Sequence, residues 1–190
     1  METVRAFIAV DIGDDIRGRL DELQRKLKKV HANVRWVNPR SMHLTLAFLG
    51  DVPREQIESI GQVIDRACEG QAPFKLEAAG TGFFGKPKSP RVLWAGIDTC
   101  PALAELQHRM AAGLMEAGIA FDDKPFSPHL TLGRVKAIDQ HTGSLLQKIG
   151  KYADARLGEM RIDHVELIQS TLTPRGAEYT VLHRAGLAAT

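Results

Sequence analysis

Cysteine is scarce in this chain, which contains only two among its 190 residues. Cys68 and Cys100 stand in unrelated surroundings, with no Cys-x-x-Cys or histidine-spaced pattern near either. The sequence therefore excludes a disulfide framework and a cysteine-based zinc site. We expect both residues to be free thiols in a reducing cytoplasm.

Long apolar runs are also missing. No uninterrupted apolar segment approaches the roughly 20 residues that a membrane-spanning helix needs. Near the N-terminus the apolar stretch Ala6–Val10 ends at Asp11, which makes it too short for the core of a signal peptide. We therefore expect a cytoplasmic protein that does not enter a membrane.

Neither sign of charge dominates the composition. Lysine and arginine number 25 and aspartate and glutamate 23, which gives a formal net charge of +2. This charge is too small for a protein that binds duplex DNA through a basic surface, but it suits a small anionic ligand or an RNA end if the positive residues cluster. With 44% hydrophobic residues, the chain is long enough to form a sizeable core in one domain or two small lobes.

The apolar patterning predicts strands and helices in an irregular order. Strands are expected at 4–12, 34–37, 43–50, 74–79, 91–97, from 129 onward, at 160–171 and at 178–187, the last two joined by a turn at Pro174-Arg175-Gly176. Helices are expected at 16–30 after a capping turn at 13–15, from Pro53 to Gly70, from Pro101 to Gly118, and at 140–155. This order lacks the regular alternation of a doubly wound parallel sheet, so it favours an α+β fold with mostly antiparallel sheets.

One tetrapeptide occurs twice, as His-Leu-Thr-Leu at 43–46 and again at 129–132. Along a strand, side chains alternate between faces, so the histidine and the threonine share one face and the leucines the other. The two histidines are 86 residues apart (129 − 43), close to half of the chain, and each motif is followed by a predicted helix. The repeat predicts a pair of duplicated lobes, and because no low-complexity linker divides them we expect residues 1–190 to fold as one bilobal domain.

This pattern suits phosphoryl transfer without a metal ion. In-line attack on phosphorus needs a base for the incoming water and an acid for the leaving oxygen on opposite sides. Two histidines from two facing lobes, His43 and His129, satisfy that geometry. The hydroxyls of Thr45 and Thr131 can donate hydrogen bonds to the phosphate oxygens. Arg134, five residues after His129, is a further candidate for phosphate binding.

Other interpretations of the same residues remain open. Both histidines can be partly buried strand residues whose ring nitrogens bond to the backbone. A metal site is a weaker alternative, because the pair has no obvious nearby set of further ligands. Arg91, which heads a strand after a lysine-rich loop, is a second candidate for holding a phosphate. The other five histidines are expected at the surface.

The paired motifs closely resemble those of the two-histidine phosphoesterase superfamily. Within it the chain is similar to the bacterial and archaeal RNA 2′,3′-cyclic phosphodiesterases, historically called 2′-5′ RNA ligases. Further matches lie along the whole chain, at Arg5–Ala9, Arg35–Val37, Phe84–Gly85, Pro90–Trp94, Ser127–Pro128, Gly133–Arg134 and Ser170.

The resemblance implies a bilobal fold with pseudo-two-fold symmetry, helices on the outside and a central cleft that holds both motifs. It implies an enzyme that opens a 2′,3′-cyclic phosphate at an RNA 3′ end to a 2′-phosphomonoester, without metal or cofactor. His43 would give a proton to the leaving 3′-oxygen and His129 would take one from water. Thr45, Thr131 and Arg134 would bind the phosphate. The spacing by itself does not say which histidine is acid and which is base.

Two alternative functions are consistent with the same site. One is the joining of tRNA halves through a 2′-5′ bond, which is the reverse reaction with a 5′-hydroxyl as nucleophile. The other is a module that binds nucleotides or RNA without turning them over. The expected partners are RNA 3′ ends or nucleotides that carry the cyclic phosphate, and we expect a monomer.

Overall fold

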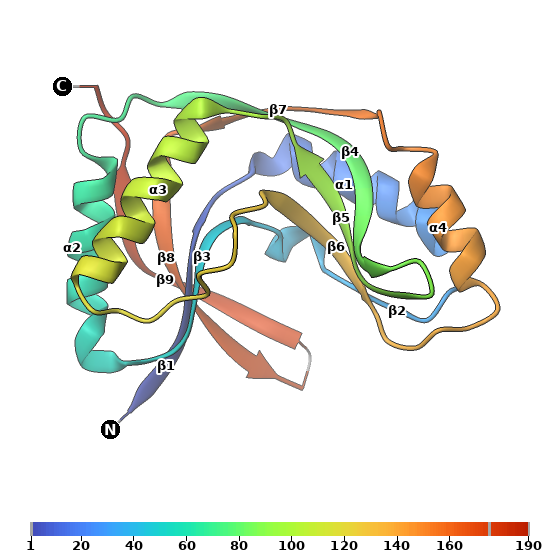
Figure 1. Ribbon diagram of the computed structural model, residues 1–190, viewed down its shortest axis with the longest axis horizontal. Helices are drawn as coiled ribbons and strands as arrows, with labels where there is room; N and C mark the ends of the chain where they lie inside the picture. Colours follow the sequence, from blue (N-terminus) through green and yellow to red (C-terminus); the bar gives the residue numbers. More distant parts are fainter. Residues whose placement is uncertain (1, 175, 190) are drawn as a thin grey trace.

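The computed structural model describes residues 2–174 and 176–189. Over these residues the chain forms two antiparallel sheets and four α-helices (Figure 1). The strands are β1 (Thr3–Val10), β2 (Val34–Trp36), β3 (Leu44–Pro53), β4 (Phe74–Lys86), β5 (Ser89–Ile97), β6 (His129–Val135), β7 (Arg156–Ile162), β8 (His164–Thr173) and β9 (Gly176–Gly186). The helices are α1 (Gly13–Lys28), α2 (Ile57–Cys68), α3 (Pro101–Glu116) and α4 (Thr142–Gly150), with 3-10 turns at Pro39–Ser41 and Arg54–Gln56. The predicted α+β fold with antiparallel sheets is confirmed.

The first sheet, which we call sheet A, has the strand order β3-β1-β8-β9. Its strand β1 buries residues on both faces, which is why its sequence is almost continuously apolar. Ile8 and Val10 belong to the main hydrophobic core, whereas Phe7 and Ala9 form a small separate cluster with Ile168 of β8 on the opposite face. Thr45 of β3 lies directly opposite Ala9, so it shares that second face. We call this face, with Phe7, Ala9 and Thr45, the site face of sheet A.

The second sheet, sheet B, has the strand order β2-β6-β5-β4-β7. In β5, Leu93 and Ala95 are fully buried in the main core, and Trp94 points to the other face. Thr131 of β6 lies opposite Trp94 and His129 lies opposite Gly96. We call the face with Trp94, Thr131 and His129 the site face of sheet B.

The helices pack on the opposite faces of the two sheets, and two of them cross over. Helix α1 follows β1 of sheet A but packs against β7 of sheet B, while α3 follows β5 of sheet B but packs against α2 and β3 beside sheet A. A shift of 86 residues moves β1 to 89–96 and α1 to 99–114, close to β5 and α3. The two halves of the chain are thus a structural repeat, but each lobe is built from both halves.

Several predicted boundaries are wrong for identifiable reasons. Gly50 does not end the first motif's strand, because with φ of 69° it lies at a bulge that β3 passes through before ending at Pro53. The expected strand 160–171 is divided at Asp163 into β7 of sheet B and β8 of sheet A. The apolar alternation changes phase at this division, from Met160 and Ile162 to Val165 and Leu167, and this signal was missed in the sequence.

The helix boundaries also differ from those predicted. Helix α4 ends at Gly150 rather than at residue 155, and α2 begins at Ile57, after a 3-10 turn that follows Pro53. The turn at 13–15 provides no side-chain cap for α1. The predicted turn at Pro174-Arg175-Gly176 connects the paired strands β8 and β9, but Arg175 lies outside the described residues.

Strand β4 extends well beyond the predicted segment 74–79 to Lys86. The added segment is rich in glycine, and Gly82 is needed inside the strand. A Cβ atom at this position would lie 2.4 Å from the ring of Trp94. The glycine therefore makes room for an indole ring on the site face of sheet B.

Candidate active site

The first motif begins immediately before β3. Leu44 and Leu46 point into the core and are 0% and 3% exposed, whereas His43 and Thr45 are half-buried on the site face of sheet A. The Nδ1 atom of His43 lies 3.2 Å from the main-chain oxygen of Ser41, two residues earlier. The alternation predicted from the sequence therefore holds in the first motif.

The second motif opens β6 and has the same construction. Leu130 and Leu132 are fully buried, and His129 and Thr131 are half-buried on the site face of sheet B. Here the Nδ1 atom of His129 lies 2.7 Å from the main-chain oxygen of Ser127. A serine precedes both histidines by two residues, so the repeat is longer than the tetrapeptide, and this signal was missed in the sequence.

The shared contact determines the state of each imidazole ring. A carbonyl oxygen only accepts hydrogen bonds, so Nδ1 must carry the hydrogen in both histidines. In the neutral ring the other nitrogen, Nε2, then holds a lone pair and is free to accept a proton or, when protonated, to give one away. The two motifs therefore present the same reactive atom.

The two motifs come from different sheets, and their strands β3 and β6 contact each other. The starts of β3 and β6 come together near the middle of the molecule (Figure 1). The amide of Asp122, in the segment that leads to the second motif, donates to the oxygen of Phe48 in β3 at 2.9 Å. The ring of Tyr179 in sheet A is 5.7 Å from that of His43, and the positive charge of Arg134 in sheet B acts on the Tyr179 hydroxyl.

Aromatic rings contact both histidines edge to face. Phe7 and Tyr179 lie against His43, with ring centroids 6.2 and 5.7 Å away. Phe84 lies against His129 at 4.8 Å and an interplanar angle of 87°. These contacts restrict the orientation of each imidazole and remove part of its surface from water.

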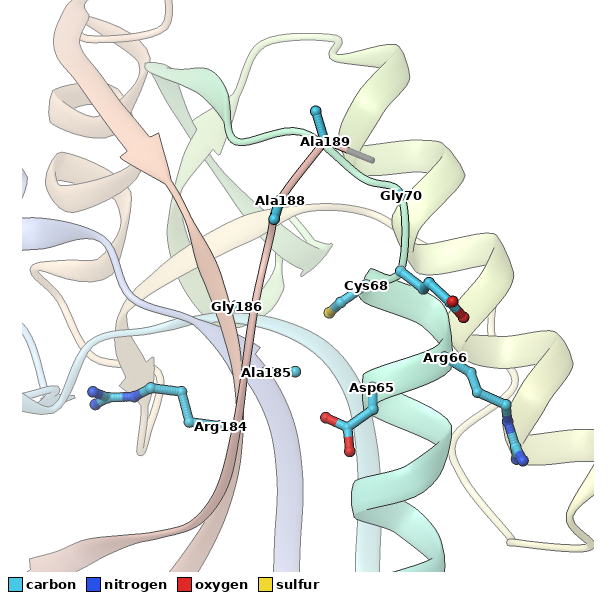
Figure 2. A pocket seen from close by; sticks show the side chains of 10 residues that line it. Asp65, Arg66, Cys68, Gly70, Arg184, Ala185, Gly186, Ala188 and Ala189 are labelled. Carbon is cyan, nitrogen blue, oxygen red and sulfur yellow. The ribbon is translucent and has the colours of Figure 1, made fainter.

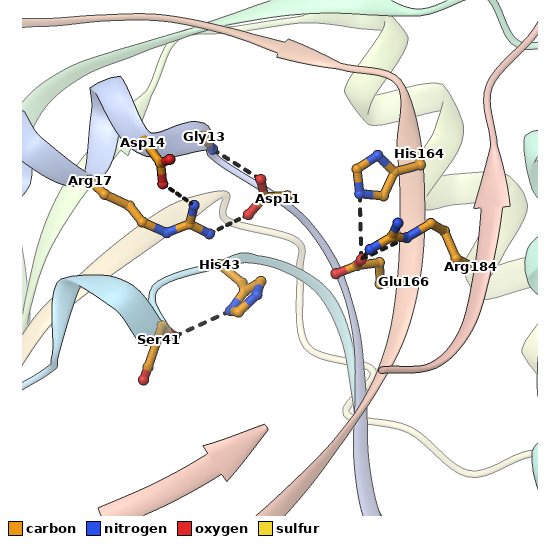
Figure 3. A network of polar contacts seen from close by, with 9 residues as sticks. All are labelled: Asp11, Gly13, Asp14, Arg17, Ser41, His43, His164, Glu166 and Arg184. Atoms are coloured by element: carbon orange, nitrogen blue, oxygen red, sulfur yellow. Dashed lines mark hydrogen bonds and ion pairs between the residues drawn. The ribbon is translucent and has the colours of Figure 1, made fainter. Parts of the chain in front are cut away.

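Two charged groups lie near His43 (Figure 3). Asp11, just after β1, forms an ion pair with Arg17 of α1. Glu166 of β8 is only 4% exposed, and its carboxylate accepts hydrogen bonds from Arg184, with 2.9 Å to the Nε atom. Each carboxylate is thus paired with an arginine, so His43 does not face an isolated negative charge.

These surroundings lower the pKa of His43 from its ordinary value of 6.5. Burial is the largest cause because it disfavours the charged ring, and the positive charge of Arg17 acts in the same direction. The hydrogen bond to Ser41 and the charges of Asp11 and Glu166 oppose the shift without overcoming it. His43 is therefore neutral in the free protein at neutral pH.

Burial raises the pKa of the Tyr179 hydroxyl, although the positive charge of Arg134 opposes the shift. Arg134 is exposed on the site face of sheet B, since it lies opposite Val92, two residues from Trp94 along β5. The structure thus places Arg134 on the same face as His129 and Thr131. Arg91, the second arginine candidate, lies exposed at a bulge of β5.

Gln24 connects the segments that carry the two motifs, and sequence reasoning missed it. This side chain on α1 is 0% exposed, and its amide donates to the oxygens of Val37 at 2.7 Å and Leu132 at 2.8 Å. Val37 leads into the first motif and Leu132 ends the second. The available signal was a polar residue within the apolar stripe of α1, between Leu20, Leu23 and Leu27.

The histidines outside the motifs are not all simple surface residues. His164 contacts Glu166 at 3.5 Å, and His183 contacts Asp65 of α2 at 2.8 Å. Cys68 is buried, and burial raises the pKa of its thiol to about 11. Within the described part of the chain, no three His, Cys, Asp or Glu side chains are grouped so that they could hold a metal ion.

Two hollows in the described part of the molecule lie away from both motifs. Figure 2 shows one of about 520 Å³ between the end of α2 and the end of β9, next to Cys68 and Ala188. Another, of about 430 Å³, lies between the start of α1 and the junction of β7 with β8. Neither is lined by a residue of the two motifs, whose reactive groups stand on the sheet faces. Among the described helices, none is long and apolar enough to cross a membrane.

Comparison with known proteins gives consistent similarities over nearly the whole chain. The sequence model of the LigT-like phosphoesterases matches residues 10–94 and again residues 97–179. The RNA 2′,3′-cyclic phosphodiesterase of Methanothermobacter thermautotrophicus is 34% identical over 177 residues, which cover 93% of this chain and 95% of that protein.

Solved structures have the same architecture. The crystal structure of TT0787 of Thermus thermophilus superimposes with a TM-score of 0.82 at 31% identity, covering 97% of this chain and 98% of that one. The structure of Escherichia coli LigT complexed with NADP+ has a TM-score of 0.76 at 25% identity, covering 98% and 99%.

Proposed function

The chain belongs to the LigT-like phosphoesterase family, and from that premise we propose that it hydrolyses RNA 2′,3′-cyclic phosphate ends to 2′-phosphomonoesters. The observation that carries the proposal is the identical construction of the two motifs on two different sheets. Each supplies an imidazole anchored through Nδ1, with a threonine hydroxyl two residues further on the same face. An in-line reaction needs such groups on both sides of one phosphorus atom.

The proposed step is a single displacement at phosphorus. Water attacks the phosphorus of the cyclic ester while the bond from phosphorus to the 3′-oxygen breaks. The Nε2 atom of His129 takes a proton from the water, and the Nε2 atom of His43 gives a proton to the leaving 3′-oxygen. The products are a 2′-phosphate and a free 3′-hydroxyl, and each proton-transfer group contributes about 10²–10⁴-fold to the rate.

The assignment of His43 as the acid follows the family resemblance, and it requires a protonated ring. Burial lowers the pKa of His43 in the free protein. A bound phosphate places a negative charge beside the ring, which favours its protonated form and raises that pKa again. Binding of the substrate would thus help to protonate His43, the acid that the reaction needs.

Thr45, Thr131 and Arg134 form the proposed phosphate-binding set. The two hydroxyls can donate hydrogen bonds to the non-bridging oxygens from opposite sheets, and the arginine supplies positive charge on the sheet B side. All steps are carried by groups of the chain itself, so we propose that the reaction is independent of metal ions and cofactors.

We further propose that the enzyme works as a monomer in the cytoplasm. Both motifs come from one chain, so the site needs no residue from a second copy. The two cysteines are free thiols, which a reducing compartment maintains. Sedimentation of the purified protein at the mass of a dimer would contradict the monomer.

The direct test is hydrolysis of adenosine 2′,3′-cyclic phosphate in excess EDTA, with the product identified by chromatography. We expect adenosine 2′-phosphate, whereas 3′-phosphate would mean that the other ester bond breaks. Absence of turnover despite tight binding would indicate a binding module. An RNA with a 5′-hydroxyl end tests the joining reaction, and joining faster than hydrolysis would make ligation the main activity.

A further inference from the structure

Two arginines lie side by side on the site face of sheet B. Arg35 of β2 lies directly opposite Arg134 of β6, and both side chains are exposed. Within residues 2–174 and 176–189, neither guanidinium forms a hydrogen bond or an ion pair. Exposed Arg156 of β7 differs, since it forms ion pairs with Glu77 and Asp98.

This arrangement costs stability and is suited to an anion. Like charges directly opposite each other on neighbouring strands are destabilising. The planar guanidinium group of an arginine carries donors that match the geometry of phosphate oxygens, and two such groups can bind one phosphate jointly. A phosphate bound between Arg35 and Arg134 would relieve their repulsion.

The position of the pair relative to the motif is given by the strand register. Thr131 lies opposite Trp94 and Arg134 lies opposite Val92, so the arginines are one side-chain row beyond the threonine. Two residues along a strand span about 7 Å. This spacing is similar to that between the 5′-phosphate and the cyclic phosphate of a single nucleotide.

The equivalent row of sheet A has the opposite character. There Phe48 lies opposite Phe7, Phe7 opposite Ile168, and Ile168 opposite Val181. Phe48 and Val181 are 51% and 45% exposed, so this row presents an apolar surface. The two site faces therefore differ beside the motifs, and phosphate groups are favoured only on the side of sheet B.

From these observations we infer that Arg35 binds the phosphate on the 5′ side of the terminal nucleotide, next to Arg134, which also faces the cyclic phosphate. The inference rests on the proposed function and narrows its substrate class. Preferred substrates carry a phosphate ester on the 5′-oxygen of the nucleoside that bears the cyclic phosphate, as every RNA chain end does. Nucleoside 2′,3′-cyclic phosphates with a free 5′-hydroxyl are poorer substrates.

Three substrates test this: adenosine 2′,3′-cyclic phosphate, the same compound with a 5′-phosphate, and the dinucleotide ApA with a 2′,3′-cyclic end. For the unmodified enzyme we expect the two 5′-phosphorylated substrates to have a kcat/KM about tenfold above the first, the effect of one charge-assisted hydrogen bond. In Arg35→Ala this advantage should disappear while turnover of the first substrate changes less than twofold. The matched control is Arg161→Ala, an exposed arginine on the other edge strand of sheet B, which should retain the advantage.

The outcomes separate this inference from the proposed function. If kcat/KM is higher for the dinucleotide but not for the 5′-phosphorylated mononucleotide, the enzyme recognises the extra nucleoside and not the phosphate, and the inference is wrong. An equal loss on all three substrates in Arg35→Ala would also overturn it. Failure of the unmodified enzyme to open any of them would instead contradict the proposed function.

A binding measurement tests Arg35 independently of turnover. The affinity for a ten-nucleotide RNA with a terminal 2′-phosphate is measured by fluorescence anisotropy at several salt concentrations. Loss of one phosphate contact should reduce the slope of log Kd against log salt by about 0.7 for single-stranded RNA. We expect this reduction in Arg35→Ala and not in Arg161→Ala, and equal slopes in all three proteins would refute the contact.

Discussion

Replacement of Gln24 by leucine tests how the two motifs are held in place. Leucine keeps most of the volume but removes both amide hydrogen bonds, to Val37 and Leu132. The oxygen of Leu132 retains a second donor, the amide of Val37 at 3.0 Å, whereas the oxygen of Val37 has no other donor among the described residues. One half-buried carbonyl is therefore left without a donor among the described residues.

The expected cost follows from this count. Each lost bond contributes about 0.5–1.5 kcal/mol, and the half-buried carbonyl left without a donor adds up to about 1 kcal/mol, so we expect a loss of roughly 2–4 kcal/mol in unfolding free energy. For a chain of this size 1 kcal/mol corresponds to about 2–4 °C in Tm, which predicts a decrease of roughly 5–15 °C. Because the amide joins the approach to the first motif with the second, we also expect kcat to fall by up to about 10²-fold.

The assay combines thermal unfolding by circular dichroism with turnover of adenosine 2′,3′-cyclic phosphate at a temperature where the variant is folded. Gln62→Leu is the matched control, since Gln62 is an exposed residue of α2, and its Tm should change by less than about 2 °C. We also propose that both lobes unfold in one transition, because α1 and α3 each pack beside the sheet that they do not follow. A variant with unchanged Tm and unchanged kcat would refute the role of Gln24, and two separate transitions would refute the single unit.

Three further predictions concern the site itself. Thr131→Val keeps the shape of the side chain but removes a hydroxyl donor, and should lower kcat by about 10²–10³-fold with little change in Tm; an unchanged kcat would exclude a bond to the reacting phosphate. Gly82→Ala places a methyl group 2.4 Å from the ring of Trp94, so it should lower the unfolding free energy by about 1–3 kcal/mol and shift the tryptophan fluorescence. The control Gly143→Ala, where no atom lies within 4 Å of the added methyl group, should change neither. The ring of His43 should titrate below 6.5 in NMR spectra of the free protein, because burial lowers its pKa. The unfolded ring binds protons more readily, so the contribution of His43 to stability is intact above pH 6.5 and is lost as the pH falls towards the pKa of the folded protein. A pKa of His43 at or above 6.5 in the folded protein would contradict the described burial.

The sequence predicts the elements of the motifs well because their pattern is local. Alternation in His-Leu-Thr-Leu correctly places the leucines in the core and His43 and Thr45 on one face. The repeat at half the chain length likewise predicts a duplicated α+β fold. The structure brings the segments that carry the two motifs together.

What the sequence could not predict depends on contacts between distant segments. The division at Asp163 shows only as a change of phase in the apolar alternation, which does not say that the second piece joins the other sheet. Gln24 bonds to a residue 108 positions away, and nothing local indicates the partner. Arg35 and Arg134 become neighbours only through the pairing of β2 with β6. Each case requires the sheet order, which periodicity does not contain.

The central claim is that two histidines from two sheets act on one phosphate. The most direct measurement is the single-turnover rate of opening of adenosine 2′,3′-cyclic phosphate in excess EDTA by His43→Asn, His129→Asn and the double variant. Exposed His108 on α3 provides the matched control His108→Asn, which should keep the full rate. We predict that each single variant loses about 10²–10⁴-fold and that the double variant loses far less than the product of the two, because the groups act as a unit. A full rate in either single variant would contradict the claim.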